Sequence, residues 1–273
     1  MIDFPNCKIN LGLNVTSRRS DGFHDIETQF FPVPFHDAVE IIPAPDGVFQ
    51  FRTSGIEIPG EPEENLIVRA FRLLQADYHL PEVRMHLHKV VPAGSGLGGG
   101  SSDAAYTLKI VNQVFTLGID NSTLLDYARR LGSDCAFFIG NKPALAFGKG
   151  DQFEPFGPDL QGLYLVIVIP GVHVSTADAY SMVVPAVHTP SIREVIQLPV
   201  DVWKDLLVND FEKPVFAKFP VIGHIKQELY DAGAVYASMS GSGSALYGLF
   251  ADRPVTGQFN RYFVWETYLG AIR

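Results

Sequence analysis

The chain has 273 residues, 47% of them hydrophobic and 19% charged, which is typical of a globular protein with one large or two ordinary domains. The formal net charge of -9 argues against nucleic acid and anionic membranes as partners, because such a surface repels polyanions. Two cysteines, Cys7 and Cys135, form neither a CxxC pair nor a zinc-type spacing. No signal peptide and no membrane span are predicted, so a reducing cytoplasm is the expected location.

The first predicted element is a strand over residues 8–15. Apolar and polar residues alternate there, with Lys8 and Asn10 on the polar face, which predicts a half-buried strand. Residues 18–22 end in Asp-Gly, and apolar residues resume at Phe23. This pattern predicts a hairpin or a longer strand connection.

Helices and strands then interleave. Asn65 is expected to cap a helix, and residues 83–91 alternate as a strand. A glycine-rich loop follows, and a helix is expected from Ser101 or Ser102 to about residue 115. Ser122 is expected to cap the next helix, with Gly132 as its stop.

The composition changes past Asp151, where a polar, proline-containing stretch precedes the apolar strand 163–169. We therefore predict a boundary near Pro155, which divides the chain into residues 1–155 and residues 156–273. The second part carries a predicted helix over about 219–232 and a glycine-serine turn at 240–244 between two strands. Interleaved helices and strands indicate an α/β or α+β fold.

The most informative segment is the loop from Pro92 to Ala105, with the sequence PAGSGLGGGSSDAA. It places five glycines and three serines between a strand and a helix. Glycines allow close approach of the backbone to a ligand, and a helix N-terminus offers unpaired N–H groups. Together these features predict a phosphate-binding loop rather than a flexible connection.

The residues of this loop exclude two common types of phosphate loop. A Walker-type loop needs a lysine before its final Ser or Thr, and Gly100 is followed by Ser101. No VAIK, HRD or DFG motif of a protein kinase is present. The dinucleotide pattern GxGxxG does match at residues 94–99, with Asp120 at about the right distance for a ribose-binding acid. However, Asp120 lies between two helical patterns, so a dinucleotide-binding oxidoreductase is the runner-up.

Phosphoryl transfer also needs charge neutralisation and a group that takes the proton of the attacking hydroxyl. Lys8 and Asn10 share one face of the first strand, and Asp134 follows a helix stop. Composition and spacing alone favour Lys8 as an ordinary solvated strand residue and Asp134 as an ordinary turn residue.

The chain resembles the 4-diphosphocytidyl-2-C-methyl-D-erythritol kinase family, within the superfamily of galactokinase, homoserine kinase, mevalonate kinase and phosphomevalonate kinase. The resemblance covers most of the chain. The motifs that carry it are Pro5-Asn-Cys-Lys-Ile-Asn-Leu11, Arg18-Arg-Ser-Asp-Gly-Phe-His24, Asn65-Leu-Ile-Val-Arg-Ala70, the loop from Pro92 to Ala105, Gly132-Ser-Asp-Cys-Ala-Phe-Phe138, Pro170-Gly171 and Ser240-Gly-Ser-Gly-Ser244.

The resemblance implies a two-domain α+β small-molecule kinase fold with the active site in the cleft between an ATP-binding domain, 1–155, and a C-terminal domain, 156–273. It implies Asp134 as the catalytic base and Lys8 as its cationic partner. Asn65 would lie near the adenine. The ATP phosphates would be held by Pro92, Ala93, Gly94, Ser95, Gly96, Leu97, Gly98, Gly99, Gly100, Ser101 and Ser102. The CDP-linked alcohol would be bound by Asn10, Phe23, His24, Thr176 and Tyr180.

Within that acceptor site, Phe23 and Tyr180 are the expected sandwich for the cytosine, with His24 at its edge. Phe23 stands where the family usually has Tyr, and Ser133, Cys135 and Ala136 replace the usual Ala, Val and Pro around the aspartate. No dedicated metal site is predicted. Magnesium is expected to arrive with ATP and to touch Ser102 or a neighbour.

Three other interpretations remain open. The first is another kinase of the superfamily, which would phosphorylate homoserine or a mevalonate. The second is a dinucleotide-dependent oxidoreductase, which would bind NAD. The third is a non-catalytic binding protein, which would need no catalytic base. His86 and His88 share a strand face, but two ligands without a third make a poor metal site. Small-molecule substrates are the expected partners, and the chain is expected to be a monomer or a weak homodimer.

Overall fold

A computed structural model describes residues 1–270 of the chain. Within these residues the chain divides into two compact units, each made of several segments. Unit 1 comprises residues 1–8, 32–93 and 98–142, and unit 2 comprises residues 9–31, 94–97 and the described residues from 143 onward. The chain therefore passes between the units several times. The boundary predicted near Pro155 stays a proposal; that residue belongs to unit 2.

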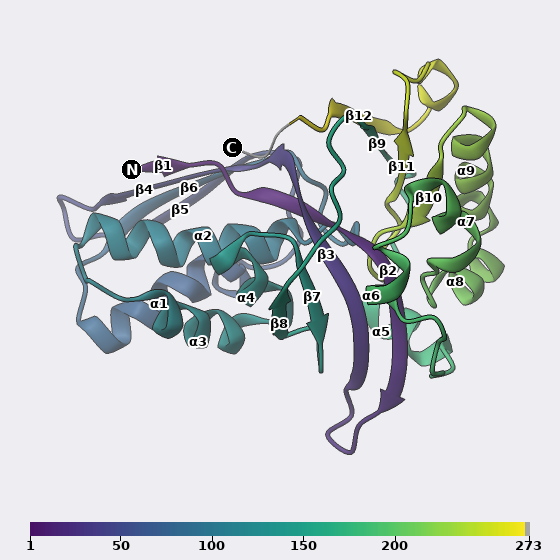
Figure 1. The fold of residues 1–273 in the computed structure, drawn as a ribbon. Coiled ribbons are helices and arrows are strands. Elements are labelled where there is room, and N and C mark those ends of the chain that lie inside the picture. Colours follow the sequence, from purple (N-terminus) through teal and green to yellow (C-terminus); the bar gives the residue numbers. More distant parts are fainter. Residues whose placement is uncertain (271–273) are drawn as a thin grey trace. The chain divides into compact units, whose positions relative to one another are not determined.

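Unit 1 contains a four-stranded sheet with α-helices packed on it (Figure 1). Its strand order is β1 (Ile2–Asp3), β4 (Ala38–Pro43), β6 (Val83–Lys89) and β5 (Gln50–Gly55). β5 and β6 run parallel, with α1 (Leu66–Tyr78) between them in the chain, which gives a βαβ unit before the glycine loop. The other helices are α2 (Gly99–Val114), α3 (Asn121–Leu131) and α4 (Ser133–Gly140). Helix α2 packs against α1, α3, α4 and strand β4.

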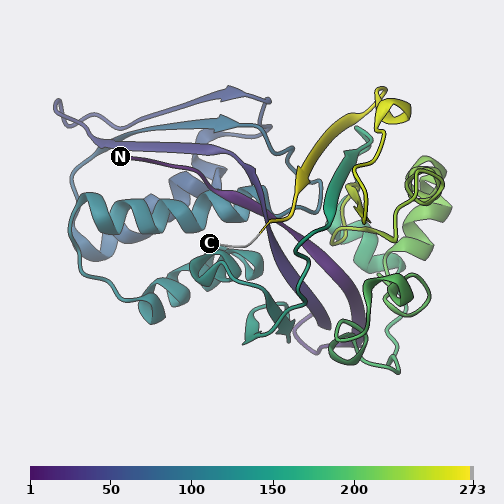
Figure 2. The ribbon, with the colours of Figure 1, turned by 45° about the horizontal axis from the view of Figure 1, so that its top comes forward.

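Unit 2 contains a second four-stranded sheet, visible in a turned view in Figure 2. Its strand order is β10 (Tyr236–Met239), β11 (Leu246–Phe250), β9 (Tyr164–Ile169) and β12 (Phe263–Tyr268), and every pair is antiparallel. The helices of this unit are α5 (Thr176–Met182), α6 (Ile192–Val195), α7 (Trp203–Leu206), α8 (Glu212–Lys218) and α9 (Pro220–Asp231). Helix α9 packs on β10 and β11 through Ile222, Ile225 and Leu229, all fully buried.

A third sheet has the strand order β2 (Asn6–Arg18), β3 (His24–His36), β7 (Ala144–Phe147) and β8 (Gln152–Pro155). The predicted hairpin is confirmed: β2 and β3 are joined by the turn around Gly22. The expectation that β2 is half-buried is wrong, because every residue from Asn6 to Val15 is buried. Of its buried polar side chains, Lys8 pairs with Asp134, and Asn10 donates a hydrogen bond to Thr28.

Most other predicted elements are confirmed, with corrections at helix starts. Asn65 caps α1 as expected, its side chain accepting a hydrogen bond from the Ile67 N–H. Asp120, not Ser122, caps α3, because its carboxylate accepts the Thr123 N–H. This role removes the ribose-binding interpretation of Asp120. Mixed helices and sheets in two compact units agree with the predicted α+β fold.

Candidate active site

Unit 1 brings the predicted base and its cationic partner together. Lys8 lies on β2, and Asp134 lies in the first turn of α4, where Gly132 ends α3 and starts the next helix. The Lys8 Nζ atom is 3.4 Å from the Asp134 Oδ2 atom. Lys8 is only 3% exposed, whereas Asp134 is 36% exposed. The lysine is therefore held inside the protein, and the carboxylate remains accessible to a substrate.

The end of the glycine loop lies against this pair. Gly98 has a left-handed backbone, with φ +72°, and forms the N-cap of α2. A Cβ atom at Gly98 would lie 3.1 Å from the Lys8 Cε atom and 3.2 Å from the Phe138 ring. Glycine is therefore needed here both for its φ angle and for the close approach. Asp134, Lys8 and the loop end at Gly98 therefore form one group in unit 1.

Helix α2 begins earlier than the sequence suggested. Its first residues are Gly99 and Gly100, not Ser101 or Ser102, because Gly98 can adopt the left-handed cap conformation. The first two N–H groups of α2 thus come from Gly99 and Gly100, at a helix N-terminus suited to phosphate. The Ser102 hydroxyl is buried and has no hydrogen-bond partner among the described residues. An orphaned hydroxyl at this place fits a phosphate oxygen or a magnesium ion.

The remaining part of the glycine loop is shared between the units. Pro92 and Ala93 belong to unit 1, and residues 94–97 belong to unit 2. In unit 2 the imidazole of His173 lies beside Gly94, where a Cβ atom would come within 3.0 Å of it. Gly94 and Gly96 both have left-handed φ angles, of 70° and 88°. The loop conformation therefore requires glycine at both positions.

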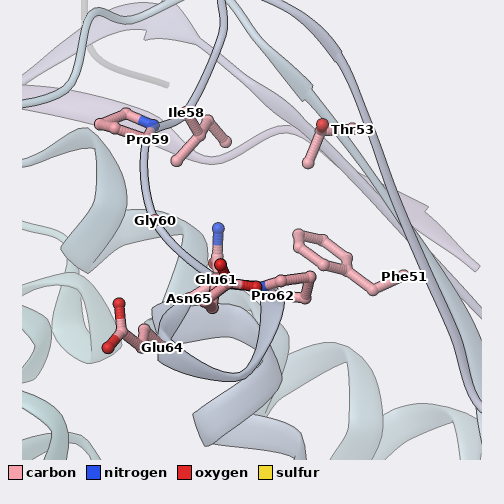
Figure 3. A pocket seen from close by; sticks show the side chains of 9 residues that line it. All are labelled: Phe51, Thr53, Ile58, Pro59, Gly60, Glu61, Pro62, Glu64 and Asn65. Atoms are coloured by element: carbon pink, nitrogen blue, oxygen red, sulfur yellow. The ribbon is translucent and has the colours of Figure 1, made fainter.

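Unit 1 also contains a pocket of about 350 Å³ next to the N-terminus of α1 (Figure 3). Figure 3 shows the amide nitrogen of Asn65 pointing into the space between Phe51, Thr53 and Ile58. The pocket combines the apolar side chains of Phe51, Ile58 and two prolines with the polar side chains of Thr53, Asn65 and two glutamates. The sequence predicted only Asn65 here. The pocket is lined by Phe51, Thr53, Ile58, Pro59, Gly60, Glu61, Pro62, Glu64 and Asn65.

The predicted acceptor residues lie in unit 2, and two of their rings are stacked. The rings of His24 and Tyr180 have centroids 5.0 Å apart and an interplanar angle of 29°. Tyr180 also contacts the Phe211 ring edge-on at 4.8 Å. Phe23 is 55% exposed, and the Lys149 ammonium lies 4.8 Å from its ring centroid. His24 therefore occupies one face of Tyr180, and the Phe23–Tyr180 sandwich stays a prediction.

The other two predicted acceptor residues differ in exposure. Asn10 is buried, and its amide nitrogen donates to the Thr28 hydroxyl at 2.9 Å, which in turn donates to the Gly12 carbonyl. Thr176 is exposed at the start of α5, and its hydroxyl accepts a hydrogen bond from Ser242 at 3.2 Å. Thr176 is thus open to a ligand, and Asn10 is anchored within the protein.

His86 and His88, the two histidines of β6, share a hydrogen-bond partner on the neighbouring strand β5. The Ser54 hydroxyl on β5 lies 2.9 Å from His86 Nε2 and 2.9 Å from His88 Nδ1. Across residues 1–270 no three His, Cys, Asp or Glu side chains gather into a metal-binding group.

Cys7 and Cys135 are both buried free thiols.

The sequence interpretation missed a buried ionic cluster next to the glycine loop. Lys89 Nζ donates to Asp37 Oδ2 at 2.5 Å and to Asp103 Oδ2 at 2.7 Å. All three residues are buried. The alternation of β6 places Lys89 on the same face as Val83, Met85 and Leu87. A charged residue on this otherwise apolar face was the only hint in the sequence of a buried ionic cluster. The cluster joins the end of β6 to the first turns of α2.

Comparisons with known proteins show which family the chain resembles. The family models "GHMP kinases N terminal domain" and "GHMP kinases C terminal" match residues 65–144 and 200–256. A 4-diphosphocytidyl-2-C-methyl-D-erythritol kinase of Bacteroides fragilis is 50% identical, covering 98% of this chain and 100% of its own length. The corresponding protein of Bacteroides thetaiotaomicron is 52% identical, covering 92% of each chain.

A solved structure of a 4-(cytidine 5'-diphospho)-2C-methyl-D-erythritol kinase superposes with a TM-score of 0.80. The two proteins are 30% identical, and the match covers 97% of this chain and 98% of that one. In the described part of the chain, no helix is long and apolar enough to cross a membrane. The early lysine-asparagine strand, the glycine loop and the full-length similarity together establish that this chain belongs to the 4-diphosphocytidyl-2-C-methyl-D-erythritol kinase family of GHMP kinases.

Proposed function

We propose that this protein transfers the γ-phosphoryl group of ATP to the 2-hydroxyl group of 4-diphosphocytidyl-2-C-methyl-D-erythritol, a step of non-mevalonate isoprenoid precursor synthesis in the cytoplasm. The observation that carries the proposal is the Lys8–Asp134 pair beside the loop end at Gly98, in a chain half identical to kinases of that name. Residues of both units serve the same reaction. The acceptor and ATP are its small-molecule partners, and a monomer or weak homodimer is the predicted state.

In this proposal Asp134 takes the proton of the attacking hydroxyl. The acceptor oxygen forms a bond to the γ-phosphorus, and the bond from that phosphorus to the oxygen bridging to the β-phosphate breaks, so ADP leaves. The Lys8 ammonium, 3.4 Å from the carboxylate, neutralises negative charge at this place. Such catalysis depends mainly on positioning and on electrostatic stabilisation.

ATP is proposed to bind in unit 1 through two features. The pocket that includes Phe51 and Asn65 would receive the adenine, and the glycine loop from Pro92 to Ser102 would hold the phosphates. Magnesium bound to ATP would supply a counter-charge for the phosphates and touch the orphaned Ser102 hydroxyl. The CDP moiety would bind in unit 2, at the aromatic group formed by Phe23, His24 and Tyr180.

The test of this function is release of ADP by the purified protein with ATP, magnesium and a panel of acceptors. We expect turnover with 4-diphosphocytidyl-2-C-methyl-D-erythritol and none with homoserine, mevalonate or galactose. Turnover with one of the other three would assign the chain to a sibling activity. Activity with none of the four would refute the proposed reaction.

The acceptor residues give a second, more specific expectation. Stacking of a base on an aromatic ring is worth roughly 1–3 kcal/mol. Tyr180→Ala should therefore weaken binding of the acceptor by up to about a hundredfold, and Tyr180→Phe should leave it nearly unchanged. Free CDP should compete with the acceptor, and UDP should not. Calorimetric titration with CDP checks this expectation; equal competition by UDP, or unchanged affinity in Tyr180→Ala, would contradict the cytosine site.

A further inference from the structure

The short helix α4 carries the proposed base at one end and a hydrogen-bonding asparagine at the other. Asp134 lies in the first turn, and Gly132, which precedes the helix, provides no side-chain cap. Asn141 ends the helix in the left-handed conformation, with φ 48° and ψ 45°. Its backbone N–H donates to the Phe137 carbonyl at 2.8 Å. The proposed reaction does not use the Asn141 side chain, so the contacts of this side chain need another explanation.

The Asn141 amide contacts the first residue of β2 and a tyrosine of α2. Its nitrogen donates to the Asn6 amide oxygen at 2.7 Å and to the Tyr106 hydroxyl at 3.1 Å. The Tyr106 hydroxyl in turn donates to the same Asn6 oxygen at 3.0 Å. Asn6 is only 6% exposed, and its amide nitrogen donates to the Cys7 carbonyl at 2.8 Å, which fixes the orientation of the amide. Asn6, Tyr106 and Asn141 thus form a closed triangle of hydrogen bonds.

A left-handed helix end does not by itself explain an asparagine whose side chain points inward. Asparagine is common at such positions because its backbone tolerates the conformation. His79 ends α1 with nearly the same angles, φ 51° and ψ 45°, but its side chain is exposed. The Asn141 side chain therefore makes contacts that ending the helix does not require.

The triangle is a second connection between β2 and α4. The first connection is the ion pair of Lys8 and Asp134. Asn6 lies two residues before Lys8 and on the same face of β2. Asn141 lies seven residues after Asp134, about two helical turns along the same side of α4. Both connections therefore act on the same two elements, one beside the proposed base and one away from it.

The two connections differ in how firmly they hold. The 3.4 Å between the Lys8 Nζ and Asp134 Oδ2 atoms is longer than the distance of about 2.7–2.9 Å usual for a charged N–H···O bond. Asp134 is also 36% exposed, so water competes for its carboxylate. Helix α2 adds a further bond beside the triangle, because the Lys109 Nζ atom donates to the Phe138 carbonyl at 2.7 Å. The position of α4 against β2 therefore depends on the triangle more than on the ion pair.

We infer that Asn6, Tyr106 and Asn141 are positioning residues for the proposed base, because they fix α4 against β2 and so keep the Asp134 carboxylate beside Lys8. The inference rests on the proposed role of Asp134. The three residues touch no substrate and act only through the placement of that carboxylate. A displacement of about 1 Å at a reacting group can lower a rate by about a hundredfold.

Asn141→Gly is the decisive variant, because glycine adopts the left-handed conformation readily and only the amide group is lost. We expect kcat to fall by about tenfold to a hundredfold, with the KM of ATP and the affinity for CDP within about twofold of wild type. His79→Gly is the matched control, since it places glycine at an exposed left-handed helix end of the same unit. The control should keep the wild-type kcat. A folded Asn141→Gly protein with wild-type kcat would overturn the inference.

A combined variant separates positioning of the base from a general loss of order. If the triangle acts only through the base, removal of the Asn141 amide costs nothing further once residue 134 cannot accept a proton. Asn141→Gly combined with Asp134→Asn should therefore react within about twofold of Asp134→Asn alone. A further loss of about tenfold in the combined variant would show that the triangle acts on something other than the base, and would overturn the inference.

Hydrogen exchange measured by mass spectrometry needs no turnover, so it stands apart from the test of the proposed function. Loss of one hydrogen bond shifts a local opening equilibrium by roughly 2- to 12-fold. Exchange over residues 133–140 should become faster by at least this factor in Asn141→Gly, whereas exchange over α1 in His79→Gly should not change. Unchanged exchange in α4 would overturn the inference even if the acceptor panel supports the proposed reaction. Faster exchange without turnover on any acceptor would refute the reaction and leave the placement of α4 by the triangle intact.

Tyr106→Phe decides the matter if Asn141→Gly does not fold, because it removes one hydroxyl group and keeps the ring. It should change kcat and the exchange of α4 in the same direction, by roughly 2- to 12-fold. Tyr127→Phe is its control, since that hydroxyl donates to Asp77 in the same unit at 2.6 Å and lies outside the triangle. Wild-type kcat and exchange in Tyr106→Phe, or equal losses of kcat in the two variants, would overturn the inference.

Discussion

Asp134→Asn is expected to lower kcat by about 10²- to 10⁴-fold, the usual cost of losing a general base. Asparagine keeps the shape of the side chain in the first turn of α4 but cannot accept a proton from the acceptor hydroxyl. The Lys8 side chain is almost fully buried next to this carboxylate, so we expect it to keep its position in the variant. The affinities for ATP and for CDP should change little, because neither the adenine pocket nor the aromatic group contains Asp134.

Single-turnover kinetics with saturating ATP and acceptor measure this effect on the chemical step. Asp126→Asn is a matched control, because Asp126 is an exposed residue of the same unit and pairs only with Arg129 among the described ion pairs. We expect the control to retain wild-type turnover. A near-normal rate in Asp134→Asn would show that another group takes the proton, and the role of Lys8 would then need a different explanation.

The fold could be predicted largely from local patterns. Alternating residues predicted the strands β2 and β6, an apolar run predicted β9, and caps and glycine stops predicted α1 and α3. The errors arose where two neighbouring residues could each satisfy the same local rule, as at the start of α3. Ser122 looked like a cap, but Asp120 is two residues earlier and its carboxylate reaches the free N–H groups.

The burial of β2 could not be predicted from alternation. A strand with Lys8, Asn10 and Asn14 on one face is normally solvated on that face. Here these side chains are buried because partners from distant segments satisfy two of them: Asp134 pairs with Lys8, and Thr28 accepts the amide of Asn10. Lys8 and Asp134 lie far apart in the sequence, and Asn10 and Thr28 lie on separate strands, so neither pairing leaves a trace in a local pattern.

The site residues were predicted by resemblance and not by spacing. From the residues alone, Lys8 and Asp134 were favoured as ordinary surface groups, and the structure shows them 3.4 Å apart next to Gly98. The pocket residues Phe51 and Ile58 carry no motif, so only the three-dimensional arrangement shows them near Asn65. A Cβ atom at Gly243 would lie 2.3 Å from the Gly96 nitrogen, and this close contact between two glycine-serine segments is equally invisible in one sequence.

The ionic cluster of Lys89, Asp37 and Asp103 gives the largest expected effect on stability. One buried ammonium is shared by two buried carboxylates. Burial opposes the charge on Lys89, but the two carboxylates outweigh it and raise the pKa of Lys89. Burial raises the pKa of Asp103 to about 7, against the opposing effect of the Lys89 ammonium. The Lys89 ammonium therefore compensates the negative charge of both carboxylates.

Lys89→Met should lower the free energy of unfolding by about 3–5 kcal/mol, because removal of one partner leaves buried charge without compensation. Asp103→Asn should cost much less, since Lys89 and Asp37 remain a neutral pair and Asp37 keeps its hydrogen bonds from the Val90 and Val91 N–H groups. Guanidinium denaturation of the two variants at pH 7.5 measures both effects. Equal destabilisation by the two substitutions would contradict the shared-charge account.

The pH dependence provides the sharper test of the same cluster. Asp103 has a raised pKa in the folded protein, about 7 against an ordinary value of 3.8, so the folded state holds this proton more tightly than the unfolded state. Deprotonation therefore costs stability, and the contribution of Asp103 falls as the pH rises from about 4 to about 7. Asp103→Asn lacks this titration, so its stability relative to wild type should improve steadily across that interval and stay constant above it. Denaturation midpoints measured for both proteins at pH values from 5 to 8.5 check the sign, because titrating groups that do not interact with Asp103 cancel in the difference. A difference that is independent of pH, or that changes in the opposite direction, would show that Asp103 is already ionised throughout this range.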